Sequence, residues 1–236
     1  MSFTENLYNE CVKIGLELDE TALGRFETYY RMLIEYNEKM NLTAITEENE
    51  VIVKHFCDSL YLLTKFDLKN GAKVIDVGTG AGFPGIPLLI ARPDIKLTLL
   101  DGLNKRLVFL SDVLEALGLQ AEIVHSRAEE AANDKKYREK YDVATSRAVA
   151  RLNVLAEYCL PYVKKDGVFL AMKGPAAAEE LKDAENALKI LGGKVTKTEE
   201  YILSDESTRS IIITEKVAHT HPSYPRHNSK IKKQPL

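Results

Sequence analysis

The stretch VIDVGTGAGFPG, residues 74–85, decides the fold, because four glycines follow directly on a short apolar run. The apolar run predicts a buried strand, and the apolar residues from Pro84 to Ala91 predict a helix that begins after the loop. A strand, a glycine loop and a helix in this order are typical of the first turn of a doubly wound sheet. Glycines at that turn let a ligand lie against bare backbone.

The same alternation continues toward the C-terminus. Short β-rich runs separated by helices predict a parallel sheet covered by helices on both faces. The last two runs, GGKVTKTEEYIL and TRSIIITE, are joined only by SDES, which is too short for a crossover helix and predicts an antiparallel hairpin. This α/β architecture, a doubly wound, seven-stranded and mostly parallel sheet, is Rossmann-like and typical of class I adenosylmethionine-dependent methyltransferases. The predicted strands before the hairpin are KVIDV, KLTLL, AEIVH, YDVAT and GVFLAM.

The periodicity changes near residue 70, and we expect three segments. Residues 1–69 repeat apolar side chains at helical spacing, with Asp19 as a predicted N-cap, and form a helical cap packed on the main domain. Residues 70–217 form the methyltransferase domain. Residues 218–236 form a basic C-terminal tail with four lysines and arginines and no acidic residue.

The tail differs in charge from the rest of the chain. It carries +4, so the remainder carries −7 of the net charge of −3. A basic extension on an acidic body favours a polyanionic partner such as RNA. A solvated, disordered tail is the alternative. We expect the tail to add affinity for RNA and to leave cofactor binding unaffected.

Length and composition fit a globular protein with a sizeable core, since 45% of the 236 residues are hydrophobic. The apolar runs fall short of the ~18 residues that a membrane span needs, and the N-terminus carries no signal-peptide pattern. We therefore expect a soluble, cytoplasmic protein. The three cysteines, Cys11, Cys57 and Cys159, lack CxxC spacing, which predicts buried, reduced thiols and no metal site.

The glycine loop indicates the ligand. Gly78 to Gly82 reads GxGxG, whereas a dinucleotide fingerprint reads GxGxxG. Asp76 precedes the loop, and a carboxylate there would repel a pyrophosphate but could face the ammonium of a methionine moiety. A cationic ligand without phosphate is therefore predicted, and S-adenosyl-L-methionine meets both conditions. A nucleotide or a decarboxylated relative of this cofactor is the alternative.

Topology adds further candidates at strand ends. Asp101 ends the second predicted strand, where a carboxylate can accept both ribose hydroxyls. Residues after the third strand border the adenine in this fold, although they can equally start a helix. Arg147 ends the fourth strand, where methyl group and acceptor meet, and is predicted to position them, with a surface ion pair as the alternative. The predicted cofactor-binding residues are Asp76, Gly78, Gly80, Phe83, Asp101, Gly102, Leu103, Ala128, Glu129 and Arg147.

Missing motifs narrow the chemistry. No Asn/Asp-Pro-Pro-aromatic motif follows the fourth strand, which argues against exocyclic amine methylation. No Pro-Cys or Thr-Cys nucleophile is present, which argues against methylation of pyrimidine carbon 5. A ring nitrogen with a free lone pair, such as guanine N7, fits and needs no general base. Hydroxyl and phenol acceptors stay open.

Several motifs occur together in one order, and in them the sequence resembles the glucose-inhibited division protein B family. These bacterial methyltransferases make 7-methylguanosine in 16S ribosomal RNA, near the decoding region of the small subunit. The resemblance runs from the second predicted helix to the last residue, and it departs at Ser229 and Ile231, where relatives usually have Gly and Pro. The motifs are NLTAI, KHFCDSLYLL, DVGTGAGFPGIPLLIARPD, LLDGLNKRLVFL, HSRAEE, TSRAVA, AMKG and YPR with the terminal KKQPL.

The resemblance implies roles that composition alone leaves neutral. His55, with Asp58 and Ser59, would face the cofactor cleft; without the resemblance His55 reads as a structural histidine. Basic side chains near the strand ends would form a track for phosphates of the partner, 16S ribosomal RNA or the small subunit. The candidate RNA-binding residues are His55, Lys105, Arg106, Arg127, Lys173, Arg226, Lys232 and Lys233.

Two other functions stay open on the sequence. A small-molecule methyltransferase would use the helical cap as a lid, but it would not need the basic tail. A non-catalytic ribosome-assembly factor on the same fold would not need the cofactor set of Asp76, Gly78, Gly80 and Asp101. We expect a monomer that binds neither membrane nor metal.

Overall fold

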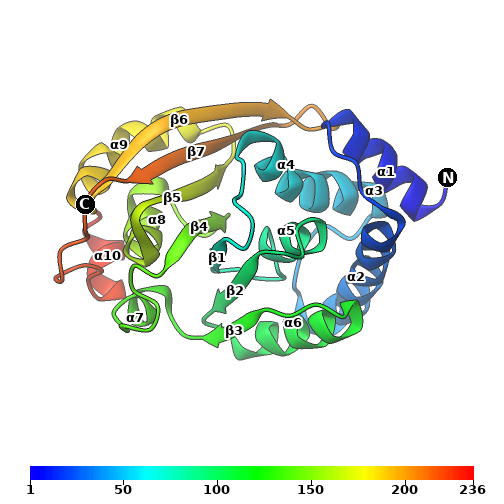
Figure 1. Ribbon diagram of the computed structural model, residues 1–236, viewed down its shortest axis with the longest axis horizontal. Coiled ribbons are helices and arrows are strands. Elements are labelled where there is room, and N and C mark those ends of the chain that lie inside the picture. The colour runs from blue at the N-terminus through cyan, green and yellow to red at the C-terminus, as the bar shows by residue number, and fades with distance from the viewer.

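The computed structural model describes residues 1–236 and has one seven-stranded sheet at its centre (Figure 1). The strand order is β3-β2-β1-β4-β5-β7-β6, and the strands β1 to β5 are parallel to their neighbours among these five. The predicted fold class is therefore confirmed. The strands are β1 (Lys73–Val77), β2 (Lys96–Asp101), β3 (Glu122–His125), β4 (Tyr141–Arg147), β5 (Val163–Lys173), β6 (Gly193–Ile202) and β7 (Thr208–Lys216).

The terminal hairpin is confirmed as well. Strand β7 runs antiparallel between β5 and β6, with Leu170 opposite Ile213 on one side and Tyr201 opposite Arg209 on the other. The central strands are buried on both faces, as their continuous apolar runs predict. The parallel strands bring their carboxyl ends to one edge of the sheet, and this edge holds the functional site.

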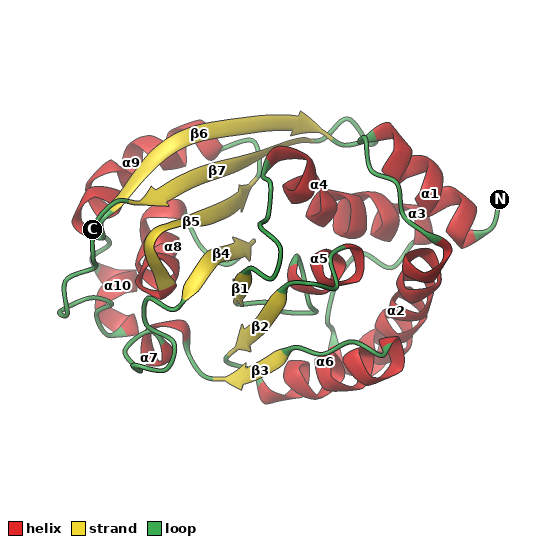
Figure 2. Ribbon diagram, in the orientation of Figure 1, coloured by secondary structure: helices red, strands yellow, loops and turns green.

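Helices cover both faces of the sheet (Figure 2). One face packs on the N-terminal helices with α5 and α6, and the other packs on α7 to α10. The helix predicted from Pro84 to Ala91 is confirmed as α5, whereas the sequence pattern gave no prediction for α9 or α10. The helices are α1 (Phe3–Lys13), α2 (Glu20–Met40), α3 (Glu48–Val51), η1 (Ile52–Cys57, π-helical), α4 (Asp58–Lys65), α5 (Gly85–Ala91), α6 (Asn104–Leu117), α7 (Ala128–Ala131), α8 (Leu152–Cys159), η2 (Leu160–Tyr162, 3₁₀), α9 (Ala177–Ile190) and α10 (Asn228–Lys233).

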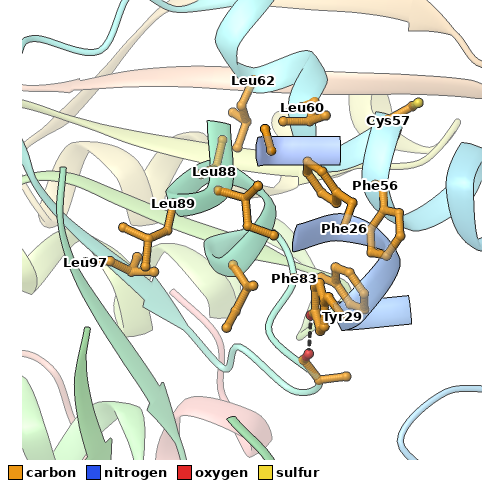
Figure 3. Close-up of a cluster of buried hydrophobic side chains, with 14 of the residues drawn as sticks. Phe26, Tyr29, Phe56, Cys57, Leu60, Leu62, Phe83, Leu88, Leu89 and Leu97 are labelled. Atoms are coloured by element: carbon orange, nitrogen blue, oxygen red, sulfur yellow. Dashed lines mark hydrogen bonds between the residues drawn. The ribbon is translucent and has the colours of Figure 1, made fainter. Parts of the chain in front are cut away.

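The N-terminal helices share one hydrophobic cluster with the sheet (Figure 3). Asp19 caps α2 as predicted, accepting from the Ala22 N–H at 2.7 Å. In the cluster the ring centroids of Tyr29 and Phe83 are 5.5 Å apart. The buried Tyr29 hydroxyl donates to the Ala81 carbonyl, so α2 is bonded directly to the glycine loop. The segment boundaries near residues 70 and 217 stay a prediction.

The C-terminal tail is ordered, so the disordered alternative is wrong. Arg138 donates to the carbonyls of Thr220, His221 and Tyr224, and Ile231 of α10 is 0% exposed. The three cysteines are free and buried, as predicted. None of the helices is long and apolar enough to cross a membrane.

Candidate functional site

A cleft of about 520 Å³, called here the main cleft, lies at the carboxyl ends of the central strands. Its volume is within the ~300–1,000 Å³ typical of small-molecule sites. One wall comes from the sheet edge: the glycine loop, the end of β2, the turn after β3 and the residues after β4. The rest of the lining, called here the second wall, comes from distant segments on the two faces of the sheet: Leu42, Thr43 and His55 on the side of the N-terminal helices, and Tyr158 of α8 with Asn228 and Lys232 of α10 on the other.

The loop glycines have different structural roles. Gly78 and Gly80 have φ of +71° and +62°, a region that favours glycine. A Cβ on Gly78 would lie 2.7 Å from Val149 Cγ2, whereas a Cβ on Gly80 would meet no protein atom within 4 Å. The backbone conformation therefore favours glycine at both positions; a Cβ on Gly78 would displace the exposed Val149 side chain, and Gly80 leaves open space at the cleft.

Asp76 does not line the main cleft, so the expectation that it faces the ligand is wrong. Its carboxylate is 0% exposed, and Oδ2 accepts from the Thr79 hydroxyl at 2.7 Å and the Gly85 N–H at 2.9 Å. Burial raises the pKa of Asp76 to about 6, although these two hydrogen bonds oppose the shift. The carboxylate thus ties the glycine loop to the start of α5. Thr79, which the sequence analysis passed over, is its partner.

Asp101 lines the main cleft at the end of β2, where it was predicted. Oδ1 accepts from the Leu103 N–H at 2.9 Å, and Oδ2 accepts from the Gly80 N–H at 3.0 Å and from Arg106 at 3.2 Å. Gly102 also lines the cleft. Leu103 bonds to Asp101 through its backbone N–H, is 48% exposed and is not part of the cleft lining, so its predicted contact with the cofactor stays a prediction.

Ala128 and Glu129 line the cleft beside Asp101, where the turn after β3 enters α7. Glu129 is only 5% exposed, and its carboxylate has no hydrogen-bonding partner in the protein. Ser126 does not cap the helix; its hydroxyl donates to the Arg127 carbonyl. The cleft therefore offers one buried, free acceptor at this end.

Arg147 joins the end of β4 to the N-terminal helices. Nη1 donates to the Lys54 carbonyl at 2.9 Å and to Asp58 Oδ2 at 2.8 Å, and Nη2 donates to His55 Nδ1 at 3.1 Å. The guanidinium also lies 4.9 Å from the ring centroid of Phe83. A surface ion pair is excluded, because the Arg147 and Asp58 side chains are only 14% and 5% exposed. The predicted role of Arg147 in positioning the reactants stays a prediction.

His55 is neutral, and both its nitrogens are engaged within the protein. Since a guanidinium only donates, Nδ1 accepts from Arg147, and Nε2–H donates to the Thr43 hydroxyl oxygen at 2.8 Å. Burial, and then the charge of Arg147, lower the pKa of His55 to about 3. His55 therefore has a structural role in the protein, and its expected contact with RNA stays a prediction. The Ser59 hydroxyl is also turned away from the cleft, donating to the His55 carbonyl at 2.6 Å.

A second hollow of about 480 Å³, called here the side hollow, adjoins the main cleft. The two share His55, Arg147 and residues 148–150. Tyr201 of β6 and Arg209 of β7 line the side hollow, and the Tyr201 hydroxyl donates to Asp58 Oδ1 at 2.9 Å. The sequence analysis missed both residues, because only the pairing of β5 with the distant hairpin brings them here.

The predicted track of basic residues is only partly formed. Lys173 is 8% exposed and bonded to the Ala150 carbonyl and to Glu180, and Arg226 is paired with Glu157. Lys105 lies outside the main cleft and donates to the Met40 carbonyl. Protein groups engage these three cations, as Asp101 engages Arg106, and their contacts with RNA stay a prediction. The remaining candidates are Arg106, Arg127 and Lys232, which line the main cleft, and Lys233, which is exposed on α10.

Adenosylmethionine fits the residues of the main cleft. Open space at Gly80 would admit the ligand against backbone, Asp101 keeps acceptor capacity for hydroxyl groups, and Glu129 is a free acceptor for an amine. No group of three or more His, Cys, Asp or Glu residues could hold a metal ion.

Comparison with known proteins agrees with this geometry. The chain is 49% identical to the ribosomal RNA small subunit methyltransferase G of Alkaliphilus metalliredigens over 232 residues, 98% of this chain and 97% of that protein. A putative methyltransferase from Bacillus halodurans superimposes with a TM-score of 0.55 at 15% identity, covering 69% of this chain and all of the other. TYW2 of P. horikoshii, solved in complex with MeSAdo, superimposes with a TM-score of 0.53 at 11% identity, covering 68% of this chain and 61% of the other.

The two solved structures show the class I methyltransferase fold, and the sequence matches show the family. The sequence model of the GidB family, described as rRNA small subunit methyltransferase G, matches residues 22–210. This protein belongs to the rRNA small subunit methyltransferase G family.

Proposed function

We propose that this methyltransferase transfers a methyl group from adenosylmethionine to guanine N7 in 16S ribosomal RNA of the small subunit. The observation that carries the proposal is the meeting of the main cleft and the side hollow at Arg147 and residues 148–150. A cofactor in one and a nucleotide in the other would meet at the end of β4. In open α/β sheets, ligands bind at this carboxyl edge.

The main cleft is the proposed donor site. When bound, adenosylmethionine supplies an electrophilic methyl group on a sulfonium. The open space at Gly80 would let the cofactor lie against the loop backbone. Asp101 would accept hydrogen bonds from the ribose hydroxyls, and Glu129 would face the adenine. Asp76 would act only through the loop that it holds.

The side hollow is the proposed acceptor site. Guanine presents N1–H and N2–H₂ donors on one edge and the N7 acceptor on the opposite edge. Glu180 lines the side hollow; its Oε2 accepts from the Leu152 N–H and pairs with Lys173, while Oε1 has no protein partner. A guanine bonded to Oε1 through its donor edge would present N7 toward the main cleft.

The proposed transfer needs alignment and no general base. Guanine N7 carries a free lone pair, so no proton leaves the acceptor as the bond forms. His55 is the only histidine that lines the main cleft, and its low pKa and engaged nitrogens make it unsuited to take a proton. Arg147 would instead hold η1, α4 and Phe83 in fixed positions relative to the end of β4, which keeps the donor site and the acceptor site aligned.

The RNA would approach over the basic side chains at the cleft. Arg127 is exposed, lines the cleft and has no side-chain partner, and Lys232 and Lys233 lie nearby on the tail. Such contacts release counterions, so binding should weaken steeply with salt. We further propose that the protein acts as a monomer in the cytoplasm.

Transfer of an isotope-labelled methyl group tests the function. The purified protein is incubated with labelled adenosylmethionine and, in parallel, naked 16S RNA, small subunits lacking the modification, or free guanosine. Label should enter RNA or subunits, with a rate at limiting substrate that falls as salt rises. Label in free guanosine with no salt dependence would indicate a small-molecule enzyme. Binding of subunits without transfer would indicate an assembly factor.

A further inference from the structure

The C-terminal helix α10 forms part of the wall of the main cleft, which the tail was not expected to do. Asn228 and Lys232 line the cleft, and Ile231 between them is 0% exposed in the cluster with α8. Immediately before α10, the Arg226 backbone N–H and guanidinium donate to Glu157, at 2.7 Å and 2.6 Å. Glu157 is itself 0% exposed. The helix is therefore docked by packing and a buried ion pair.

The Asn228 side chain is oriented by Tyr158. The Tyr158 hydroxyl donates to Asn228 Oδ1 at 2.6 Å and makes no other hydrogen bond in the protein. This contact turns the amide oxygen toward α8 and leaves Asn228 Nδ2, a donor, without a protein partner. Both residues line the main cleft, and Tyr158 is close to Glu129, because burial and in addition the charge of Glu129 raise the pKa of the Tyr158 hydroxyl.

This end of the cleft thus carries one free donor and one free acceptor. Adenine has the matching edge, because its exocyclic amine donates and the ring nitrogens beside that amine, N1 and N7, accept. Guanine also offers an acceptor, O6, beside a donor, N1–H, so this pair of groups alone does not separate the two purines. The assignment to adenine rests on Asp101 in the same cleft, the proposed partner of the ribose hydroxyls.

We propose that α10 is a wall of the cofactor site and that Asn228 binds the adenine, its amide donating to N1 or N7 while Glu129 accepts from the amine. The inference rests on the proposed use of adenosylmethionine. It assigns the tail a contact with the cofactor, so loss of α10 weakens cofactor binding as well as RNA binding.

Calorimetry with S-adenosylhomocysteine and its 1-deaza and 7-deaza analogues tests this proposal. Loss of one hydrogen bond should weaken binding about 3- to 10-fold. We expect the wild-type protein to bind either the 1-deaza or the 7-deaza analogue about 3- to 10-fold more weakly than the parent ligand, S-adenosylhomocysteine. Asn228→Ala should bind the parent as weakly as wild type binds that analogue, and it should no longer distinguish the two ligands.

Two further variants keep the test independent of folding. Asn228→Asp retains the oxygen that accepts from Tyr158 but has no N–H, so it should behave like Asn228→Ala. Gln234→Ala removes an exposed amide from the same tail outside the cleft and should match wild type. Wild-type affinity in both Asn228 variants, or retained discrimination between parent and analogue, would overturn the proposal. Failure of the wild type itself to bind S-adenosylhomocysteine would overturn the proposed function instead.

Discussion

The two walls of the main cleft differ in how they are built. The sheet-edge wall, from Gly78 to Glu129, consists of residues that directly follow strand ends. The second wall is made of distant segments that flank the sheet on its two faces, His55 of η1 on one side and Asn228 of α10 on the other, 173 residues apart in the sequence. Strand order fixes the first wall, whereas long-range packing fixes the second. Local sequence pattern can therefore predict the first wall far better than the second.

Particular residues show this limit. Asp101 lines the cleft where the strand pattern placed it, since parallel strands end at a common edge. Asp76 belongs to the same motif, yet its carboxylate turns inward to Thr79 and Gly85, a choice of side-chain direction that the motif does not encode. Lys173 and Arg226 looked like free cations, because the sequence does not reveal the carboxylates that pair with them, the partly buried Glu180 and the buried Glu157.

The largest expected effect comes from changing Arg147, which connects the end of β4 to the N-terminal helices. Arg147→Ala should lower the rate of methyl transfer by ~10²-fold or more through misalignment. It also removes the nearest cation from the buried Asp58, which keeps the Tyr201 hydroxyl and Arg209, so the loss of stability should stay below the ~3–5 kcal/mol of a buried charge left without any partner. Single-turnover rates measured below the melting temperature check the first effect. The methyl-transfer rate of Arg147→Lys, which keeps the charge but cannot bridge three partners, should lie between the rates of the wild type and of Arg147→Ala. The control is Arg31→Ala, whose side chain is 74% exposed on α2. A rate for Arg147→Ala equal to that of this control would remove Arg147 from the alignment.

On the sheet-edge wall, Asp101→Ala should weaken cofactor binding by ~1.5–3 kcal/mol, the usual loss for hydrogen bonds to a charged acceptor. Its carboxylate also holds the Gly80 and Leu103 N–H groups, so thermal melting must be measured with the calorimetric affinity. A lower melting temperature with unchanged affinity would make Asp101 a structural cap only.

Gly80→Val tests the open space in the loop. The added side chain would meet no protein atom near Cβ and would occupy the cleft, so cofactor affinity should fall about 10- to 100-fold. Gly71→Val is the matched control, because Gly71 has a similar φ of +68° and open space but lies away from the cleft. Equal affinity in both variants would place the cofactor elsewhere.

His55 should stay neutral across the physiological range. With a folded-state pKa of about 3 against a usual value of 6.5, the unfolded chain takes up the proton first as pH falls. The contribution of His55 to the free energy of unfolding should therefore decrease from pH 6.5 toward pH 3. Nitrogen NMR should report an Nε2–H tautomer with no titration between pH 5 and 8. A midpoint in that range would contradict the buried network with Arg147.

The smallest effect should come from Arg127, an exposed residue of the main cleft. Arg127→Ala should flatten the slope of log affinity for RNA against log salt by about one unit, with cofactor affinity unchanged. The slope for Arg31→Ala serves as the reference. If the two slopes agree, Arg127 does not contact phosphate.

The central claim, that the two walls align adenosylmethionine with guanine N7 of small-subunit RNA, is tested most directly by nucleoside mass spectrometry. Ribosomal RNA is digested from cells that lack this protein and from the same cells after its gene is restored. The account predicts one additional 7-methylguanosine in 16S RNA on restoration, and none when the restored copy carries Arg147→Ala at low expression. A different methylated nucleoside, or no change in 16S RNA, would contradict it.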